Sequence, residues 1–583
     1  MTSERRSFLF EIGCEEIPSR MIPPAADDLG RRIVEILDRA ELGHGLHAVW
    51  GGTRRLAVRV DDVAARQADR DETVLGPPAA VAFSADGELT QAALGFARKQ
   101  GVAVDRLERL DTERGSYVGL RRRVDGRPTA AILAETVPAA VAAMPFPKSM
   151  RWGDGRPRWV RPVHWIVAIF GGETVPIELF GIRATTRSRG HRFFDDRWVE
   201  IERPDAYVDA LRRAHVLIEP AERRERIETA LAARAAELGG TPVPDLALLD
   251  EVADLIEWPG VVAGSFDARF LELPPELLIT TLRHHQKCFS LRDDRGRLLP
   301  GFLAVGNTDR DPAGHIRRGN EWVVGGRLED ARFFWREDRK TALAALSPNL
   351  AGVTFHRKLG SYADKAERVS SLAVALAGSL GCDESELEAC RRAASWCKND
   401  LVTGTVGEFP ELQGRVGGLL LAAEGGAESV WRAIYQHYQP AGAEDEVPSG
   451  TVAQVVSVAD KLDSVCRLIE AGERASGSKD PLGLRRAGSG IVRVLLDGGW
   501  PITLAELAEL ARADEAAGAF LRERMESVLR ERGHSIKEIL SVTRARVDPE
   551  RALAWSMIDL AARLDAIKRV RGRDDFVHLV KLT

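Results

Sequence analysis

Two adjacent histidines, a lysine and a cysteine stand together in the segment TLRHHQKCFSLRDD, from Thr281 to Asp294. A structural zinc site needs about four ligands at matched spacing, and no second Cys/His cluster follows this one. Neighbouring side chains point in different directions on a strand or a helix, which disfavours a histidine dyad. We expect polar contacts to a phosphate or a base, or else an ordinary polar surface, from Arg283, His285, Gln286 and Lys287.

A second segment, KSMRWGDGRPRWVRPVHW (148–165), alternates cations with tryptophans. Cations neutralise phosphates and aromatic faces stack on unpaired bases, so this composition suits RNA. The alternative is a hairpin with buried tryptophans and solvated arginines. A further basic run, GIRATTRSRGHRFF, favours a polyanionic partner. The predicted RNA-binding residues here are Lys148, Arg151, Trp152, Arg158, Arg161, Arg189 and Arg192.

In the second half of the chain, FPELQG, YQHYQP and VADKLDSV are spaced like the helices of an HD-type phosphohydrolase. That fold holds a divalent ion with an upstream His, a His-Asp doublet and a distal Asp, and the ion activates water. The doublet is absent here, and Glu411 stands where it is expected. We therefore predict a degenerate site without a metal, formed by Asp400, Glu411, His437 and Asp460.

Nucleotide-activating motifs give only one weak lead. The segment RRAGSGIVR (485–493) has glycines followed by arginine, but a lone short Gly pattern is weak, and no P-loop is present. We expect no cofactor to be bound by this chain.

Composition indicates a soluble, cytoplasmic protein of several domains. The chain has 583 residues and a net charge of -5, and the apolar run from Phe8 to Ile12 is too short for a signal-peptide core. The longest apolar run, around Trp165 to Phe170, is far below the roughly 18 residues of a membrane span. Six cysteines without a CxxC pair predict reduced thiols.

The hydrophobic pattern divides the chain into two kinds of structure. SFLFEIG and TRRLAVRVDDV predict strands, and RPVHWIVAIFGGETVPIELFGI predicts two strands joined by a Gly-Gly turn. From Val353 onward the apolar spacing is helical, as in SYADKAERVSSLAVALAGSLG. The predicted fold is multidomain: an α+β region over 1–350, an all-helical HD-like domain over 351–500, and a short helical C-terminal segment over 501–583.

Many segments together resemble one family, the β subunit of the bacterial two-subunit glycyl-tRNA synthetase. They are spread from residue 8 to about residue 493 and include FLFEIGCEEIPSRM, GGTRRLAV, FPKSMRWG, RPVHWIVAIFGG, GHRF, LRHHQKCFSL, RLEDARFFWREDRK, VTFHRKLGSYADKAERV, KNDLVTGTVGEFPELQG, VADKLDSV and SKDPLGLRRAG.

The resemblance implies a division of labour within an α2β2 tetramer. The α subunit would carry the class II active site, using ATP and magnesium to make glycyl-adenylate, while this chain binds tRNA-Gly. It also implies that the HD-like domain contacts tRNA and that 501–583 resembles the start of an anticodon-binding domain. Two alternatives stay open: a metal-dependent HD-type phosphohydrolase acting on RNA or nucleotides, and a non-catalytic RNA-binding scaffold.

Overall fold

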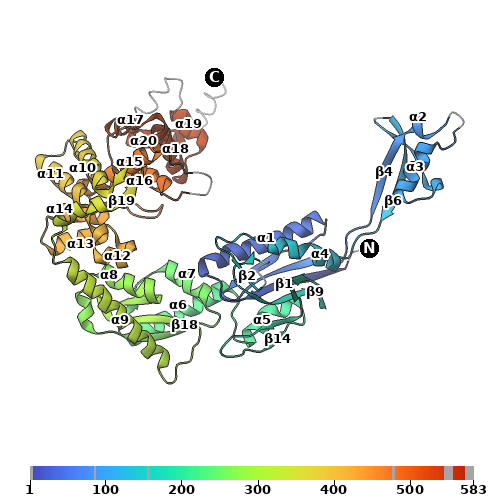
Figure 1. Ribbon diagram of the computed structural model, residues 1–583, viewed down its shortest axis with the longest axis horizontal. Coiled ribbons are helices and arrows are strands. Elements are labelled where there is room, and N and C mark those ends of the chain that lie inside the picture. Colours follow the sequence, from blue (N-terminus) through green and yellow to red (C-terminus); the bar gives the residue numbers. More distant parts are fainter. Residues whose placement is uncertain are drawn as a thin grey trace. The chain divides into compact units, whose positions relative to one another are not determined.

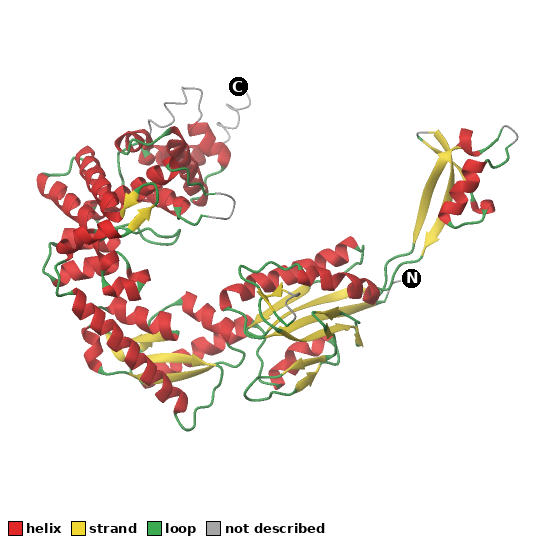
Figure 2. Ribbon diagram, viewed as in Figure 1, coloured by secondary structure: helices red, strands yellow, loops and turns green. Residues whose placement is uncertain are grey.

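The computed structural model describes residues 4–84, 87–113, 115–153, 158–475, 480–543 and 556–571. The chain forms two compact units (Figures 1 and 2). The first comprises Met1–Ser265 and Lys287–Glu321, and the second comprises Phe266–Gln286 and Trp322–Thr583. The fold is mixed α and β with a helical C-terminal region; the three-part division at residues 350 and 500 stays a prediction.

The first unit is built on a five-stranded antiparallel sheet in the order β10-β9-β1-β3-β2. The strands are β1 (Arg5–Cys14), β2 (His47–Gly52), β3 (Arg55–Ala64), β9 (Val163–Phe170) and β10 (Glu173–Thr174). Side chains alternate between the faces of a strand. Phe8, Phe10 and Ile12 of β1 enter one core and Leu9 enters another, so both faces of the sheet are covered.

Helices cover the two faces. On one face, α1 (Ile22–Arg39) packs against β2, β3 and α4 (Thr129–Ala142). On the other, Tyr207 and Leu211 of α5 (Tyr207–Arg213) join a core with Trp50 and Trp165. Shorter strands flank this body: β7 (Met150–Arg151), β8 (Arg158–Trp159), β11 (Glu178–Leu179), β12 (Ile182–Arg183), β13 (Arg187–Arg189) and β14 (Trp198–Glu200).

Two further sheets belong to this unit. The order β4-β6-β5 joins β4 (Arg70–Pro78), β5 (Glu108–Thr112) and β6 (Gly115–Val124), with α2 (Ala79–Ala82) and α3 (Gln91–Gln100). The order β15-β17-β18-β16 joins β15 (Thr241–Pro242), β16 (Gly260–Ser265), β17 (Cys288–Arg292) and β18 (Leu298–Gly306). Helices α6 (Pro220–Glu237) and α7 (Leu246–Leu255) share a core with this second sheet.

The second unit is mainly helical. Its helices are α8 (Pro275–Thr280), α9 (His315–Asp338, from Trp322 onward), α10 (Tyr362–Ser379), α11 (Glu384–Trp396), α12 (Gly404–Glu408), α13 (Arg415–Ala423), α14 (Glu428–Gln436), α15 (Thr451–Glu470), α16 (Leu484–Asp497), α17 (Leu504–Leu510), α18 (Glu515–Glu531), α19 (Ile536–Thr543) and α20 (Met557–Arg571). Ser361 starts α10 with a capping box, and Gly381, at φ +74°, follows its end.

The structure contains some of the predicted elements and differs from the prediction at others. β1, β3, β9 and α10 are confirmed. The strand expected after the Gly-Gly turn is broken into β10 and β11. The expectation of helices alone after Val353 is wrong, because β19 (Thr354–His356) pairs with β20 (Gly360–Ser361).

The cysteines are unpaired, and five of the six are buried while Cys382 is half-buried. Burial raises the pKa of the Cys14, Cys288 and Cys466 thiols to about 12, so these groups stay protonated. Over the described residues, no helix is long and apolar enough to cross a membrane.

Candidate functional site

Four segments that are far apart in the sequence meet at one end of the five-stranded sheet. β1 pairs with both β3 and β9, which brings CEE (14–16) beside TRR (53–55) and RPVHW (161–165). The backbone N–H of Cys14 donates to Arg54 O at 2.8 Å, and that of Glu15 donates to Pro162 O at 3.0 Å. The loop GHR (190–192) after β13 joins them through Arg192. We call this group of segments the sheet-end cluster.

Arg55 lies at the centre of the sheet-end cluster and is fully buried. Its guanidinium forms an ion pair with Glu257 at 2.9 Å and donates to Ser188 Oγ at 3.0 Å and to Arg189 O at 2.8 Å. Burial alone lowers the pKa of Arg55, but Glu257 and Glu11 outweigh it and raise the pKa above its ordinary value. Arg55 is therefore a permanently charged structural link.

Trp165 and Glu11 complete this inner layer. The Trp165 indole N–H donates to Glu11 Oε1, and Ser188 Oγ donates to the same oxygen at 2.7 Å. Two guanidinium groups lie over the Trp165 ring: that of Arg54 is 5.5 Å from the ring centroid, and that of Arg55 is 5.3 Å from it. Trp159 and Trp165 are both buried, so for these two tryptophans the core interpretation is right.

The rim of the sheet-end cluster is partly exposed. Arg192 pairs with Glu15 at 2.8 Å and with Glu16 at 3.3 Å, and His164 lies 3.3 Å from Glu15. The hydrogen bond from Arg192 lowers the pKa of Glu15 and raises the pKa of Arg192. Arg161 Nε donates to Glu16 O at 2.6 Å. Two predicted phosphate contacts, Arg161 and Arg192, are thus engaged by the protein itself.

Arg54 is a buried cation of the cluster that forms no ion pair with a described residue. The residue is only 7 % exposed, and its Nε and Nη1 are buried without a hydrogen-bond partner in the described part of the chain. Burial lowers its pKa, and Glu257 and Glu15 are the carboxylates that oppose this. An unpartnered buried guanidinium is costly, which makes it the most unusual group of the site.

The predicted basic hairpin is present as β7 and β8, with Met150 opposite Trp159 and Arg151 opposite Arg158. Its turn, 154–157, lies outside the described residues. Lys148, Arg151 and Arg158 are exposed, and none forms an ion pair with a described residue. Trp152 is half-buried and donates its indole N–H to Trp159 O at 3.2 Å. Arg189 is half-buried and pairs with Asp196 at 2.6 Å.

The structure does not gather the four polar residues of 283–287 into one group. Arg283 and His285 end the π-helical turn Thr281–His285. Arg283 Nη1 lies 3.1 Å from His284 Nε2, whereas the ring of His285 meets Phe409 edge-on at 5.3 Å. Gln286 is half-buried. Lys287, at φ +52°, belongs to the first unit and pairs with Glu251 at 3.0 Å.

A second group of charges is buried among α10, α11, α14 and α15, and we call it the lysine cluster. Lys398 donates to Asp460 Oδ2 at 2.8 Å and to His437 Nε2 at 2.9 Å. Lys365 pairs with Asp460 and Asp463, each at 3.1 Å. His437 Nδ1 lies 2.6 Å from Ile434 O, which fixes the neutral tautomer with its proton on Nδ1.

The pKa shifts follow from this arrangement. Burial and the Lys398 charge hold the pKa of His437 well below its ordinary value. Burial opposes the charge of Asp460, but Lys365 and Lys398 outweigh it and lower that pKa. His437 and Asp460 therefore share a lysine ammonium, and among the described residues no three His, Cys, Asp or Glu side chains form a group suited to a metal.

The other two members of the predicted degenerate site lie apart from that ammonium. Asp400 is buried, and Oδ2 accepts the backbone N–H of Gly414 and, at 3.0 Å, that of Gly417. Burial raises the pKa of Asp400 to about 6. Glu411 is a third exposed and lies 3.6 Å from His284. Asp400 thus orders the start of α13, and Glu411 is a surface carboxylate.

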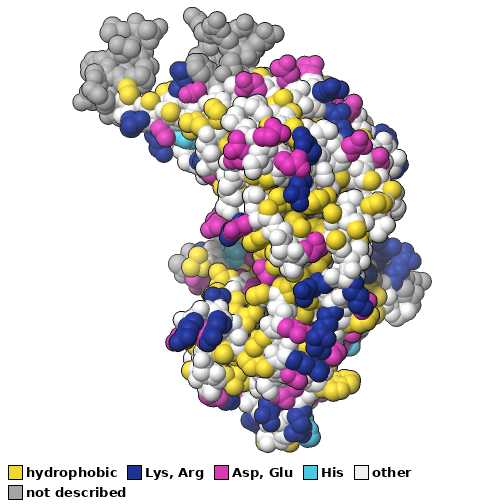
Figure 3. All heavy atoms as spheres, turned by 90° about the vertical axis from the view of Figure 1, so that its left-hand side faces the viewer, with side chains coloured by type: hydrophobic (Ala, Val, Ile, Leu, Met, Phe, Trp, Pro, Cys, Tyr) yellow, Lys and Arg dark blue, Asp and Glu magenta, His cyan; other side chains and the backbone are white. Residues whose placement is uncertain are grey.

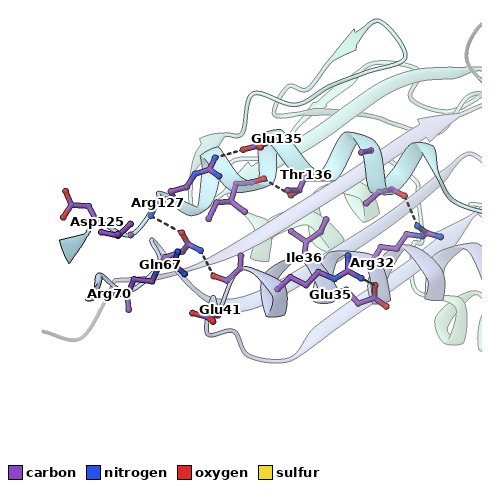
Figure 4. A pocket seen from close by; sticks show the side chains of 18 residues that line it. Arg32, Glu35, Ile36, Glu41, Gln67, Arg70, Asp125, Arg127, Glu135 and Thr136 are labelled. Atoms are coloured by element: carbon purple, nitrogen blue, oxygen red, sulfur yellow. Dashed lines mark hydrogen bonds and ion pairs between the residues drawn. The ribbon is translucent and has the colours of Figure 1, made fainter. Parts of the chain in front are cut away.

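A hollow of about 900 Å³ lies between α1, α4 and the ends of β4 and β6 (Figure 4). The Gln67 side chain crosses it, donating to Ala40 O at 2.8 Å and accepting from Arg127 N at 3.2 Å. Arg127 also pairs with Glu135 at 2.6 Å. Cations and carboxylates both line the hollow, so its charge has no dominant sign. The molecular face drawn in Figure 3 is mixed in the same way.

The family model described as "Glycyl-tRNA synthetase beta subunit" matches residues 8–544. The chain belongs to this family. A relative from Acidobacterium capsulatum named glycine–tRNA ligase beta subunit is 41% identical over 98% of this chain and 83% of its own length. Relatives of the same name from Syntrophotalea carbinolica (43%, 86% of this chain, 72% of the relative) and Myxococcus xanthus (40%, 98% and 83%) are also similar.

The glycyl-tRNA synthetase beta subunit match spans both the sheet-end cluster and the lysine cluster. Sequence reasoning missed Glu11, Glu15, Arg54, Arg55 and Glu257 in the first. It missed Lys365 and Lys398 in the second. One signal in the sequence could have found the first group. Glu15-Glu16 follow one apolar strand and Arg54-Arg55 begin another, and a charge buried beside such a strand is costly unless it is paired.

Proposed function

We propose that this chain is the tRNA-binding β subunit of a two-subunit glycine–tRNA ligase that works in the cytoplasm. It binds tRNA-Gly and orients the acceptor end toward the α subunit of an α2β2 tetramer. The α subunit uses ATP and magnesium to make glycyl-adenylate, and this chain binds no cofactor of its own. The observation that carries the proposal is the family match over 8–544.

The catalytic contribution of such a chain is positional. Holding two reactants in a productive geometry replaces a bimolecular encounter and lowers the barrier by several kcal/mol, about 7–11 in favourable cases. An RNA-binding subunit can therefore be essential to charging without touching the reacting atoms.

The surface chemistry supports an RNA partner. Arg187 and Arg189 lie 5.6 and 4.8 Å from the ring centroid of Trp198, which is itself partly exposed, and Phe193 is 73 % exposed. Exposed aromatic faces beside guanidinium groups suit stacking on unpaired bases and contact with phosphates. Lys148, Arg151, Trp152, Arg158, Arg161, Arg189 and Arg192 remain the proposed contacts of this unit, and Arg283, His285, Gln286 and Lys287 those of 283–287.

We interpret the helices around Asp400, Glu411, His437 and Asp460 as a degenerate HD-like domain that contacts tRNA. The Lys398 ammonium, held between His437 and Asp460, supports a structural role for these two side chains. The phosphohydrolase alternative predicts divalent-metal-dependent release of phosphate or nucleotide, abolished by Asp460→Ala.

The test is glycine charging of tRNA-Gly by the purified α subunit, with ATP and magnesium, in the presence and absence of this chain. We expect charging only with both chains. Equal charging by the α subunit alone, or no stimulation at any concentration of this chain, would refute the proposal. Omitting tRNA and following pyrophosphate exchange separates adenylate formation from the transfer step.

A further inference from the structure

The ion pairs of the sheet-end cluster leave one of its buried cations, Arg54, without a partner. Arg55 is matched by Glu257 and Glu11, and Arg192 is matched by Glu15 and Glu16. Arg54 Nε and Nη1 have no hydrogen-bond partner in the described part of the chain, and the Arg54 side chain forms no ion pair there. The Arg54 charge is therefore unmatched within the buried layer, where a lone charge is least favourable.

Two carboxylates act on Arg54, Glu257 and Glu15; Glu257 is held by the buried Arg55, which leaves Glu15 to relieve the unmatched charge. Glu15 follows Cys14, whose N–H donates to Arg54 O at 2.8 Å, so Glu15 and Arg54 come from adjacent backbone segments. Its side chain is 38 % exposed, and its partner Arg192 is 34 % exposed, so their ion pair lies at the surface. A surface ion pair contributes little to stability, so Arg192 can exchange Glu15 for another anion.

We propose that Arg192 is a latent site for a phosphate group of RNA, and that Glu15 opens it by moving from Arg192 to Arg54. In the free chain Glu15 neutralises Arg192. When a phosphate replaces Glu15 on Arg192, the released carboxylate pairs with the buried guanidinium of Arg54. Arg192 and Arg54 then each have an anionic partner, and Arg54 acts as a positioning residue. This inference rests on the proposed function, because it names a contact made by the bound tRNA.

Burial decides the direction of the exchange. Arg54 Nε and Nη1 are closed to solvent, so a phosphate on a bulky RNA cannot reach them, whereas a neighbouring side chain can. Arg192 is open to solvent and presents a guanidinium suited to bidentate phosphate binding. The RNA phosphate therefore binds Arg192 at the surface, and the Glu15 carboxylate binds the buried Arg54.

The experiment is tRNA-Gly binding to the complete complex of this chain with the α subunit, as a double-mutant cycle of Arg54→Met and Glu15→Gln. We expect Arg54→Met to weaken binding about fivefold or more when Glu15 is present, because the released carboxylate has no receiving cation. In the Glu15→Gln background the same substitution should have no effect. Arg54→Met with unchanged affinity, or with an equal loss in both backgrounds, would overturn the inference.

Arg122→Met is the matched control for the loss of one positive charge. Arg122 is more exposed than Arg54 and pairs with Glu72 at 2.8 Å, and the two residues lie on neighbouring strands of the β4-β6-β5 sheet. We expect unchanged affinity. A loss as large as that of Arg54→Met would mean that net charge, and not exchange, controls binding.

A structure of the tRNA complex with the unsubstituted chain tests the exchange without any variant. Glu15 within 4 Å of Arg54, with a phosphate on Arg192, supports it; Glu15 still on Arg192 overturns it. A chain that neither binds tRNA nor supports charging refutes the proposed function itself. Normal charging with an inert Arg54→Met variant refutes the exchange alone.

Discussion

The two buried charge clusters of the molecule are built from similar groups but are balanced differently. In the lysine cluster, Lys398 is held by Asp460 and His437, and Lys365 by Asp460 and Asp463. In the sheet-end cluster, Arg55 is held in the same way, but Arg54 is not. The buried ion pairs of the first cluster are matched, whereas the second has an unmatched buried cation, Arg54, beside an exposed rim.

The difference separates a structural role from a binding role. A matched buried ion pair has nothing to gain from a ligand, and removing one partner leaves an uncompensated charge. An unmatched buried cation gains a partner whenever a neighbouring carboxylate is displaced toward it. The comparison predicts that lysine-cluster substitutions change stability, while sheet-end substitutions at Arg54 and Glu15 change binding.

The largest effect is expected from Lys398→Met. It removes the ammonium between His437 and Asp460 and should lower the free energy of unfolding by about 3 kcal/mol, the lower end for breaking a buried pair. Arg54→Met, which loses no hydrogen bond, should change it by less than about 1 kcal/mol. Urea unfolding followed by circular dichroism measures both. Equal destabilisation by the two substitutions would erase the distinction between the clusters.

A smaller, pH-dependent effect is expected at Lys461. Burial lowers its pKa to about 7, and its Nζ donates to His437 O, Gln439 O and Ser457 Oγ. Between pH 7 and about 10 the unfolded chain keeps this proton and the folded chain releases it. The unfolding free energy should therefore rise with pH by up to about 1.4 kcal/mol per unit from this group.

Comparing the unsubstituted chain with Lys461→Met by urea unfolding at pH 7 and pH 9 isolates that contribution. The variant is less stable at both values because it leaves Gln439 O and His437 O without their donor. What matters is the slope: the unsubstituted chain should gain stability relative to the variant as the pH rises. Parallel pH profiles would mean that Lys461 titrates normally.

The fold could be predicted where a local pattern determines it. β1 was predictable because its run of apolar residues is long enough for a strand covered on both faces, and α10 because Ser361 and Gly381 mark its ends. The short strands β13 and β14 are held by Ser188 and Val199 pairing across a loop, and no periodic pattern marks two or three residues. β19 and β20 were missed for the same reason.

The site was less predictable because its partners are distant in the sequence. Arg55 and Glu257 are 202 residues apart, and Glu15 and Arg192 are 177 apart. Composition predicted Arg192 as a phosphate contact but could not show that Glu15 already neutralises it. Likewise, motif spacing brought His437 and Asp460 together, but the lysine between them, Lys398, lies in the turn after α11 and carries no motif of its own in the HD pattern.

The smallest effect is expected at two cations of the proposed RNA surface, of which Arg158 lies on the β7-β8 hairpin and Arg189 on β13. Arg158 has no ion pair with a described residue, whereas Arg189 is held by Asp196 at 2.6 Å. Arg158→Gln should leave stability within about 0.5 kcal/mol, weaken tRNA binding a few fold, and reduce its salt slope by about one. Arg189→Gln should change the slope less, because its charge is already neutralised.

Measuring tRNA affinity between about 50 and 200 mM salt decides this, since each phosphate contact contributes about 0.7–0.9 to the slope. If both variants keep the original slope, the hairpin is not part of the RNA surface, and RNA contacts have to be sought at the sheet-end rim around Arg192.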